Sequence, residues 1–417
     1  MEDNLQFFQA VMESDYSDLY IDAVDEITVV NLEGALEKMI DSSIQNTENY
    51  ILALRLLNHT SGEMRNKSYP WTALLLRVYV SCKEIRRAQQ IVLTLGELAI
   101  MCNTREESRK WFGSNYVENI FNTITKEYCV QIDNLIVLRC IVTLLELYPD
   151  YSADVNGSVK HFVSKFIDSL NSNTVEYSAK CCHLLLTVSK PQPNTEKKKE
   201  LWRIYQYKLV DNIQFLLNIF FGQVSLSVVD AVNCGPLHIP ILLLSDDPVE
   251  KYPQIFIRFK NLVAHLVVTL REPFHTEKLI NAKKILNLIK SALDLSHLTA
   301  RQNETINRTM LALLLPQFYF IMLQMVETLI LTLGKNLRRS YKQIWTILGD
   351  ITKYSTFKAL SEGKKSYQRL LVKVWNTTCT WCNILNQGCR SDLLSNCMMK
   401  NLLDISLIRI IPAKVSL

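Results

Sequence analysis

Residues 309–339, TMLALLLPQFYFIMLQMVETLILTLGKNLRR, decide how the rest of the chain can fold. Among the residues that precede Gly334 in this stretch, the only charged side chain is Glu327, so nearly every face of a helix built here must be hidden from water. We expect a short helix that ends near Leu315 and a long helix that starts at Pro316, because proline in the first turn of a helix gives up no hydrogen bond. The long helix should stop at Gly334. A helix that is apolar all round needs other helices on both sides of it.

The same stretch is long enough to span a bilayer. Pro316, Gln317, Gln324 and Glu327 lie inside it, however, and basic residues flank both of its ends, which leaves no positive-inside asymmetry. The sequence therefore favours a buried core helix over a membrane span. We predict a protein that is soluble without detergent and has no membrane partner.

The composition is that of an ordinary soluble globular chain. The 417 residues are 48% hydrophobic and 21% charged, with eleven glycines and eleven prolines. Few helix breakers, together with many Leu, Ile and Val at helical spacing, indicate an all-α fold. The N-terminal residues lack the basic and apolar regions of a secretory signal. We therefore expect the eleven cysteines to be thiols in a reducing compartment.

A series of amphipathic patterns of similar length runs along the chain. After two short helices within 31–58 and a polar loop, Pro70 opens a helix in which Trp71, Leu75 and Tyr79 recur at helical spacing. Further helices are expected at 84–99, 109–126, 132–147, 155–170, 174–188, 201–221, 252–270, 277–295, 337–354, 364–385 and 393–408. Helices joined by such short polar links stack as antiparallel pairs. We predict a curved α-solenoid of HEAT-like or armadillo-like architecture, although no internal sequence repeat is detectable.

Two irregular stretches interrupt the series. Residues 190–200, KPQPNTEKKKE, combine proline with charge and are expected to link an N-terminal helical-repeat half, 1–189, to a C-terminal half, 201–417. Residues 222–253 form the one long irregular segment, which we expect to lie as an extended strap across helices. A pair of β-strands is the alternative, although no partner strand is evident in the sequence.

Three stretches resemble one protein family. They are the Leu-Leu-Leu-Pro run that ends at Pro316, the Leu-Ile-Leu-x-Leu-Gly-x-x-Leu spacing of 329–337, and YPWTALLLRVYV at 69–80. These patterns are similar to the N-terminal domain of the proline-, glutamic acid- and leucine-rich protein family, animal counterparts of a yeast scaffold in large ribosomal subunit maturation. The resemblance covers roughly residues 70–405. The proline- and glutamate-rich tail that gives the family its name has no counterpart in this sequence.

The resemblance implies a function. A member of this family would be a non-catalytic scaffold in 60S ribosomal subunit biogenesis, which supports pre-60S maturation and rRNA processing in the nucleolus and nucleoplasm. The implied partners are a second helical-repeat protein, a WD-repeat propeller protein and a midasin-type ATPase, on the pre-60S particle and its rRNA. The alternative is a nuclear-transport or nuclear-receptor-type adaptor with the same helical-repeat architecture.

We find no pattern of catalytic, cofactor-binding or metal-binding residues. Glycine-rich phosphate loops, HExxH and G-x-S-x-G are absent from the sequence. Cys379 and Cys382 form a CxxC pair in a helical pattern, without a second pair at zinc spacing. Cys181 and Cys182 are expected on one wet and one buried side of a helix. We therefore predict no enzyme activity, no metal and no cofactor.

Residues 311–315 match the LxxLL pattern by which helices dock into nuclear-receptor grooves. Exposed leucines would be required for such docking. Because this LxxLL lies in the most apolar part of the chain, we expect its leucines to be buried.

Charge is distributed unevenly along the sequence. Residues 1–40 carry ten acidic side chains and one basic side chain, and they form either a solvated helix pair or a face for a basic partner. Residues 335–373 carry ten basic side chains and two acidic ones. Single exposed charges contribute little to stability, so we interpret this basic segment as a binding field for rRNA, an acidic partner or the acidic N-terminus. The candidate partner-binding residues are Lys335, Arg338, Arg339, Lys342, Lys364, Lys365 and Arg369.

Overall fold

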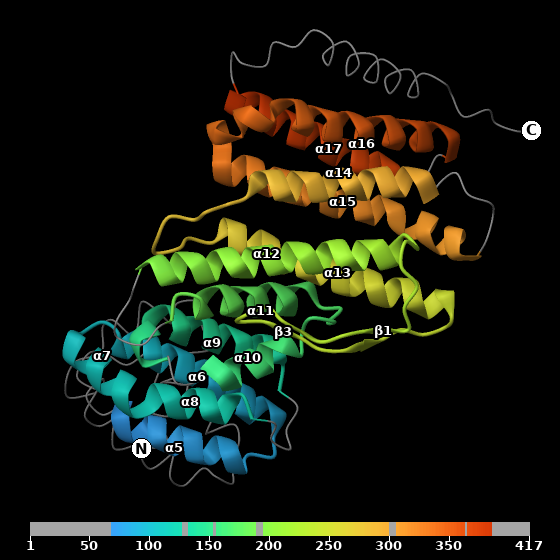
Figure 1. The fold of residues 1–417 in the computed structure, drawn as a ribbon. Coiled ribbons are helices and arrows are strands. Elements are labelled where there is room, and N and C mark those ends of the chain that lie inside the picture. Colours follow the sequence, from blue (N-terminus) through green and yellow to red (C-terminus); the bar gives the residue numbers. More distant parts are fainter. Residues whose placement is uncertain are drawn as a thin grey trace, which may run out of the picture. The chain divides into compact units, whose positions relative to one another are not determined.

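The computed structural model describes residues 68–126, 132–152, 156–188, 195–299, 306–362 and 365–385. Helices dominate these residues, and they pack as antiparallel neighbours (Figure 1). The predicted all-α fold of stacked helix pairs is confirmed. The chain clusters into two compact units, which are described separately. Unit 1 comprises Met1–Val163 and Leu184–Pro193, and unit 2 comprises Ser164–His183 and Asn194–Leu417.

Unit 1 is built on a central pair of helices. Its helices are α5 (Ser68–Ser81), α6 (Ile85–Cys102), α7 (Glu106–Phe112), α8 (Glu118–Ile124), α9 (Asn134–Leu147) and most of α10 (Asn156–Ser164). Helix α6 packs chiefly against α9, and the Tyr148 hydroxyl that follows α9 donates to the Ala99 carbonyl at 2.7 Å. A π-helical turn, η3 (Gly113–Val117), joins α7 to α8. The helix predicted at 109–126 is therefore continuous with α7 and α8 and contains a π-bulge.

Unit 2 consists of two layers of helices. One layer contains α12 (Thr195–Phe220), α14 (Ala282–Thr299) and α16 (Tyr341–Glu362), and the other contains α13 (Pro248–Arg271), α15 (Ile306–Leu333) and α17 (Lys365–Leu385). Neighbours within a layer contact each other, and α12 with α13, α14 with α15, and α16 with α17 form pairs across the layers. Most of α11 (Ser172–Leu185) also belongs to this unit. This arrangement is a helical-repeat stack (Figure 1).

The central helix differs from the prediction in one respect. Helix α15 continues through Pro316, so the expected break at this residue is wrong. An internal proline forfeits one backbone hydrogen bond and costs about 3 kcal/mol, and the burial of Leu315 and Phe318 on either side of it offsets that cost. The helix ends at Gly334, as predicted. Gly334 has a φ of +51°, a backbone conformation that favours glycine.

Helix α15 has the burial of a core helix. It contacts α13, α14, α16 and α17, and its fully buried side chains are Phe318, Tyr319, Met322, Leu323, Met325, Val326, Leu329 and Ile330. By length and composition alone, a window within Thr309–Thr356 could cross a membrane, but 56% of that window is buried inside the protein. Leu311 and Leu315 are also buried. The expected burial of the LxxLL leucines is therefore confirmed for these two, whereas Leu314 is partly exposed.

The segment expected to be an irregular strap contains a β-hairpin. β1 (Val228–Val229) pairs with β4 (Leu242–Leu243), and β2 (Val232–Asn233) pairs with β3 (His238–Ile239), both antiparallel. The partner strand thus lies in the same segment, across a tight turn at Gly235, where φ is +92°. The strand-pair alternative, and not the strap, is correct. The segment is also shorter than predicted, because α13 begins at Pro248, where the Asp247 carboxylate accepts from the Val249 N–H at 2.9 Å.

Three other expectations meet a different result. Residues 195–200 of the expected linker form the first turns of α12, and Ser164–His183 cluster with unit 2. Cys181 and Cys182 are both fully buried. Helix α11 is therefore buried on more than one face, whereas the sequence suggested one buried face and one solvent-exposed face. The acidic residues 1–40 and the helix expected at 393–408 lie outside the described residues.

Candidate functional site

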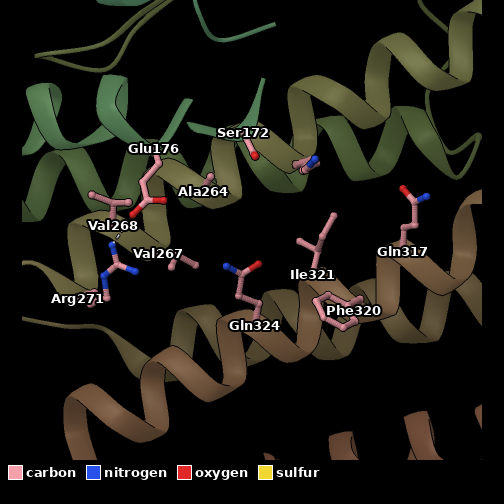
Figure 2. A pocket seen from close by; sticks show the side chains of 11 residues that line it. Ser172, Glu176, Ala264, Val267, Val268, Arg271, Gln317, Phe320, Ile321 and Gln324 are labelled. Atoms are coloured by element: carbon pink, nitrogen blue, oxygen red, sulfur yellow. Dashed lines mark hydrogen bonds and ion pairs between the residues drawn. The ribbon is translucent and has the colours of Figure 1, made fainter. Parts of the chain in front are cut away.

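A groove of about 390 Å³ crosses three helices of unit 2 (Figure 2). Helix α13 forms one wall and α15 the other, and the first two turns of α11 close one side. Positions three and four residues apart lie on the same face of a helix. On α13 the groove is therefore lined by side chains that recur at this spacing, namely Lys260, Ala264, Val267 and Arg271.

The floor of the groove is apolar. It consists of Ala264, Val267 and Val268 from α13 and of Ile321 and Phe320 from α15. Val267, Val268 and Ile321 are nearly covered, whereas the Phe320 side chain is 43% exposed. A half-exposed phenylalanine on a floor of buried aliphatic side chains leaves apolar surface that a bound side chain can cover.

Polar side chains form the rim above this floor. Gln317 and Gln324 are exposed on α15 on either side of Phe320 (Figure 2). They are two helical turns apart, or about 10 Å along the axis. Each amide has both donors and an acceptor. The pair can therefore form hydrogen bonds with the backbone of an extended segment that lies along α15.

The charged side chains of the groove are arranged in pairs. Arg271 donates to Glu176 at 2.9 Å and to Glu272 at 3.1 Å, and Glu176 also lies 3.8 Å from Lys180. The hydrogen bond to Glu176 raises the pKa of Arg271 above its usual value. Lys260, at the other end of the α13 face, has no ion-pair partner within the described ranges. The ion pairs therefore hold Arg271 and Glu176 in fixed positions at this end of the groove.

Beyond the groove, α15 contacts α17 through a second charged pair. Lys373 donates to Glu327, and its ammonium nitrogen lies 5.8 Å from the centroid of the Phe320 ring. A cation at this distance is attracted to the face of an aromatic ring. Lys373 therefore helps to fix the orientation of Phe320.

Two buried histidines lie behind this surface. His265 of α13 is fully buried, and burial lowers its pKa to about 3. Its Nδ1 lies 3.3 Å from the Tyr205 hydroxyl. Burial also lowers the pKa of His183, whose Nε2 lies 2.8 Å from the Pro273 carbonyl oxygen. Both side chains pack as neutral imidazoles in the interior of unit 2.

No cluster of three or more metal-ligating side chains forms among the residues that the structure describes. Cys379 is exposed, Cys382 is partly buried, and neither is in a disulfide. The absence of a metal, a cofactor and an enzyme activity stays a prediction.

The candidate basic residues do not form one surface. Lys335, Arg338 and Arg339 lie in the 3-10 helix η5 (Gly334–Ser340), with Lys342 at the start of α16, whereas Lys365 and Arg369 lie at the start of α17. All six lie at least partly open to solvent, and Lys364 lies outside the described residues. The 22 residues of α16 rise about 1.5 Å each. The two basic groups are therefore about 30 Å apart, at opposite ends of α16.

The groove was not predicted from the sequence. One signal was present in the sequence, because Gln317, Phe320 and Gln324 put two amides and a ring at helical spacing inside an apolar run. The other wall could not be inferred, since it depends on which helices become neighbours.

Comparisons with known proteins give only distant matches. No protein-family model and no curated protein matches the chain by sequence. A crystal structure of importin beta aligns over 95% of this chain and 50% of that chain, with 8% identity and a TM-score of 0.43. An engineered protein aligns over 89% of this chain and 98% of that chain, with 12% identity and a TM-score of 0.30. The chain thus spans half of importin beta, and neither likeness identifies its family or its function.

Proposed function

We propose that this chain is a non-catalytic helical-repeat adaptor that binds segments of partner proteins in the groove of α11, α13 and α15. The observation that carries the proposal is the groove itself, in which an open apolar floor lies beside a rim of polar side chains. A floor of this kind buries a side chain of the partner, and the rim amides orient the partner's backbone.

The rim also favours a particular partner chemistry. Lys260 and Arg271 lie at the two ends of the α13 wall, about 16 Å apart along the helix axis. An extended segment covers this length with about five residues. We therefore expect a short extended segment with a large apolar side chain at its centre and an acidic residue near Lys260.

A photoreactive side chain placed in the groove tests this function. A photoreactive phenylalanine at Phe320 should cross-link to partner proteins in cells, and Ala264→Trp, which fills the floor, should suppress those cross-links about tenfold. The same photoreactive residue at Leu331, which is 65% exposed on the same helix, serves as the matched control. Equal cross-linking at both positions, or cross-links that persist after Ala264→Trp, would contradict the proposed site.

The setting of this adaptor is proposed to be the nucleus. Nuclear transport is the first candidate, since a transport adaptor needs a helical stack and a groove for protein segments. A transport adaptor should bind a Ran-type GTPase directly. Failure of the purified chain to bind such a GTPase in either nucleotide state would contradict a role in nuclear transport. It would not bear on the proposal that the groove binds protein segments.

A pre-60S scaffold is the second candidate. It is supported by the exposed basic side chains of η5 and by the sequence resemblance described above. The helical-repeat protein, the WD-repeat protein and the midasin-type ATPase would then be its partners. We expect the wild type to co-sediment with 60S precursors, and Arg338→Glu with Arg339→Glu to weaken that association while the fold is unchanged. Unchanged sedimentation of this variant across a salt series would leave the basic group as a solvated surface.

A further inference from the structure

The half of the β-hairpin that is formed by β1 and β4, called the outer half below, exposes an apolar face. The inner half is formed by β2 and β3. Val228 and Leu243 are directly opposite each other in the ladder, and Ile241 lies two residues before Leu243, so it shares that face. Their side chains are 39%, 72% and 58% exposed, respectively. On the opposite face, Val229 and Leu244 are buried. One side of the hairpin thus packs on the protein, and the other presents three large aliphatic side chains to solvent.

The backbone of the same strands has open hydrogen-bonding positions. Within the described residues β1 and β4 form a two-stranded ladder, so each has a strand on one side only. Leu244 donates its N–H to the Ser227 carbonyl at 2.9 Å. In an antiparallel ladder the next pair, Val228 with Leu243, therefore directs its N–H and C=O groups outward. An extended segment can add to such an edge as a further strand.

The hairpin segment itself carries only negative charge, although Lys208 and Arg258 contact its inner half and Lys251 follows it. Residues 222–250 contain four acidic side chains and no lysine or arginine, although the whole chain carries a net charge of +5. The four are Asp230, Asp246, Asp247 and Glu250, and all of them are exposed. Val249, next to Glu250, adds another exposed aliphatic side chain. This combination complements a partner that is apolar and basic.

The hairpin is held in place at its inner half. The Arg258 guanidinium, which is buried and paired with Asp168, donates from Nη1 to the Pro240 carbonyl at 2.8 Å. Lys208 donates to the Asn233 carbonyl at 2.7 Å, and the His238 N–H donates to Ser164 Oγ at 3.0 Å. The exposed face is therefore presented on a fixed backbone, which lowers the entropic cost of binding.

We propose that the outer half of this hairpin is a second docking surface, which binds an extended partner segment that alternates aliphatic with basic residues. The segment pairs with the open strand edge, its aliphatic side chains cover Val228, Ile241 and Leu243, and its basic side chains approach the four acids. This surface is separate from the groove and takes a partner of opposite charge.

Three labelled peptides test the proposal by fluorescence anisotropy with the full chain. The probe is Lys-Val-Lys-Val-Lys-Val-Lys, and the controls replace every Val by Ser or every Lys by Glu. We expect the probe to bind at least about tenfold more tightly than either control. Ile241→Ser with Leu243→Ser should weaken its binding about tenfold. Asp246→Asn with Glu250→Gln should weaken it about threefold and flatten its salt dependence.

Matched variants distinguish binding at this hairpin from binding elsewhere on the protein. Val372→Ser removes an equally exposed aliphatic side chain from α17 and should leave probe binding unchanged, as should Ala264→Trp in the groove. Thermal unfolding of the hairpin variants and of Val372→Ser should stay within about two degrees of the wild type. Equal binding of the Ser control peptide would show attraction by charge alone and overturn the proposal. Absence of binding, or binding that the hairpin variants do not change, would overturn it as well.

Discussion

Helix α15 and the β-hairpin both belong to unit 2, yet they use apolar side chains differently. The helix directs Phe318, Met322 and Leu329 into contacts with neighbouring helices and buries them fully. The hairpin buries alternate side chains and leaves Ile241 and Leu243 exposed. A helix enclosed by four others contributes to stability, whereas a two-stranded ladder with one covered face has apolar surface left for a partner.

This difference predicts different costs of mutation. The buried side chains of α15 should tolerate truncation poorly, and the exposed side chains of the outer hairpin should tolerate it well. Helix α13 lies between the two regions, because it packs against α15 and its Arg258 contacts the hairpin. The following predictions test the comparison from the largest expected effect to the smallest.

Leu329→Ala should lower the free energy of unfolding by about 2 to 5 kcal/mol, because the lost leucine leaves a cavity among packed helices. Leu331→Ala is the control on the same helix, and its 65% exposed side chain should cost less than about 0.5 kcal/mol. Denaturant titrations of both variants measure the difference. Similar losses for the two would mean that α15 is not the core helix of unit 2.

Arg258→Met should cost about 2 to 4 kcal/mol, because it leaves the Asp168 carboxylate and the Pro240 carbonyl without their buried donor. Arg271→Met removes an arginine that is also paired but 53% exposed, and it should cost no more than about 1 kcal/mol. Hydrogen exchange at Val232 and Ile239, the hydrogen-bonded pair of the inner ladder, should speed up in the first variant only. Unchanged exchange there would show that Arg258 does not anchor the hairpin.

Stability should depend on pH through His265. Its folded-state pKa of about 3 lies below the unfolded value of about 6.5, so protonation favours the unfolded chain. The stability that the neutral imidazole confers is complete above about pH 6.5 and falls as the pH drops toward 3. Between pH 7 and pH 5 we expect a loss of about 2 kcal/mol in the wild type. His265→Gln should lose less over that interval, and an identical slope would contradict the assignment.

Two glycines should respond to alanine in opposite directions. Gly235 in the hairpin turn has a φ of +92°, so Gly235→Ala should destabilise the protein by about 1 kcal/mol through backbone strain. Gly349 in α16 has open space around the position of a Cβ, and Gly349→Ala should stabilise it by about 0.5 to 1 kcal/mol. Thermal unfolding of the two variants checks the signs. Stabilisation by Gly235→Ala would mean that the turn is not under conformational constraint.

The sequence predicted those parts of the fold that depend on local pattern. The central role of α15 followed from its lack of charge, and its end followed from Gly334. The break expected at Pro316 is wrong, because the tertiary packing of α15, which the sequence does not display, offsets the cost of an internal proline. The hairpin was only the alternative to the strap, because its strands are two residues long and Pro240 interrupts the ladder.

The candidate site was less predictable. The groove needs α11 and α13 to lie beside each other, and Arg271 reaches Glu176 across 95 positions of sequence. The basic residues illustrate the opposite error. Lys335 and Arg369 are close in sequence, but α16 separates their groups by about 30 Å. Proximity along a chain is a poor guide once helices of this length turn back on themselves.

Residues 164–183 must wait during synthesis for the residues that they contact in the folded protein. They are synthesised before α12, yet their partners follow much later, since Asp168 pairs with Arg258, 90 residues downstream, and Ile167 with Asn261, 94 residues downstream. At roughly 5 to 20 residues per second, the segment waits about 5 to 20 s for α13. A nascent chain interrupted before Arg258 would therefore carry α11 without its packing partner. Chaperones that recognise exposed helices would have that interval in which to bind.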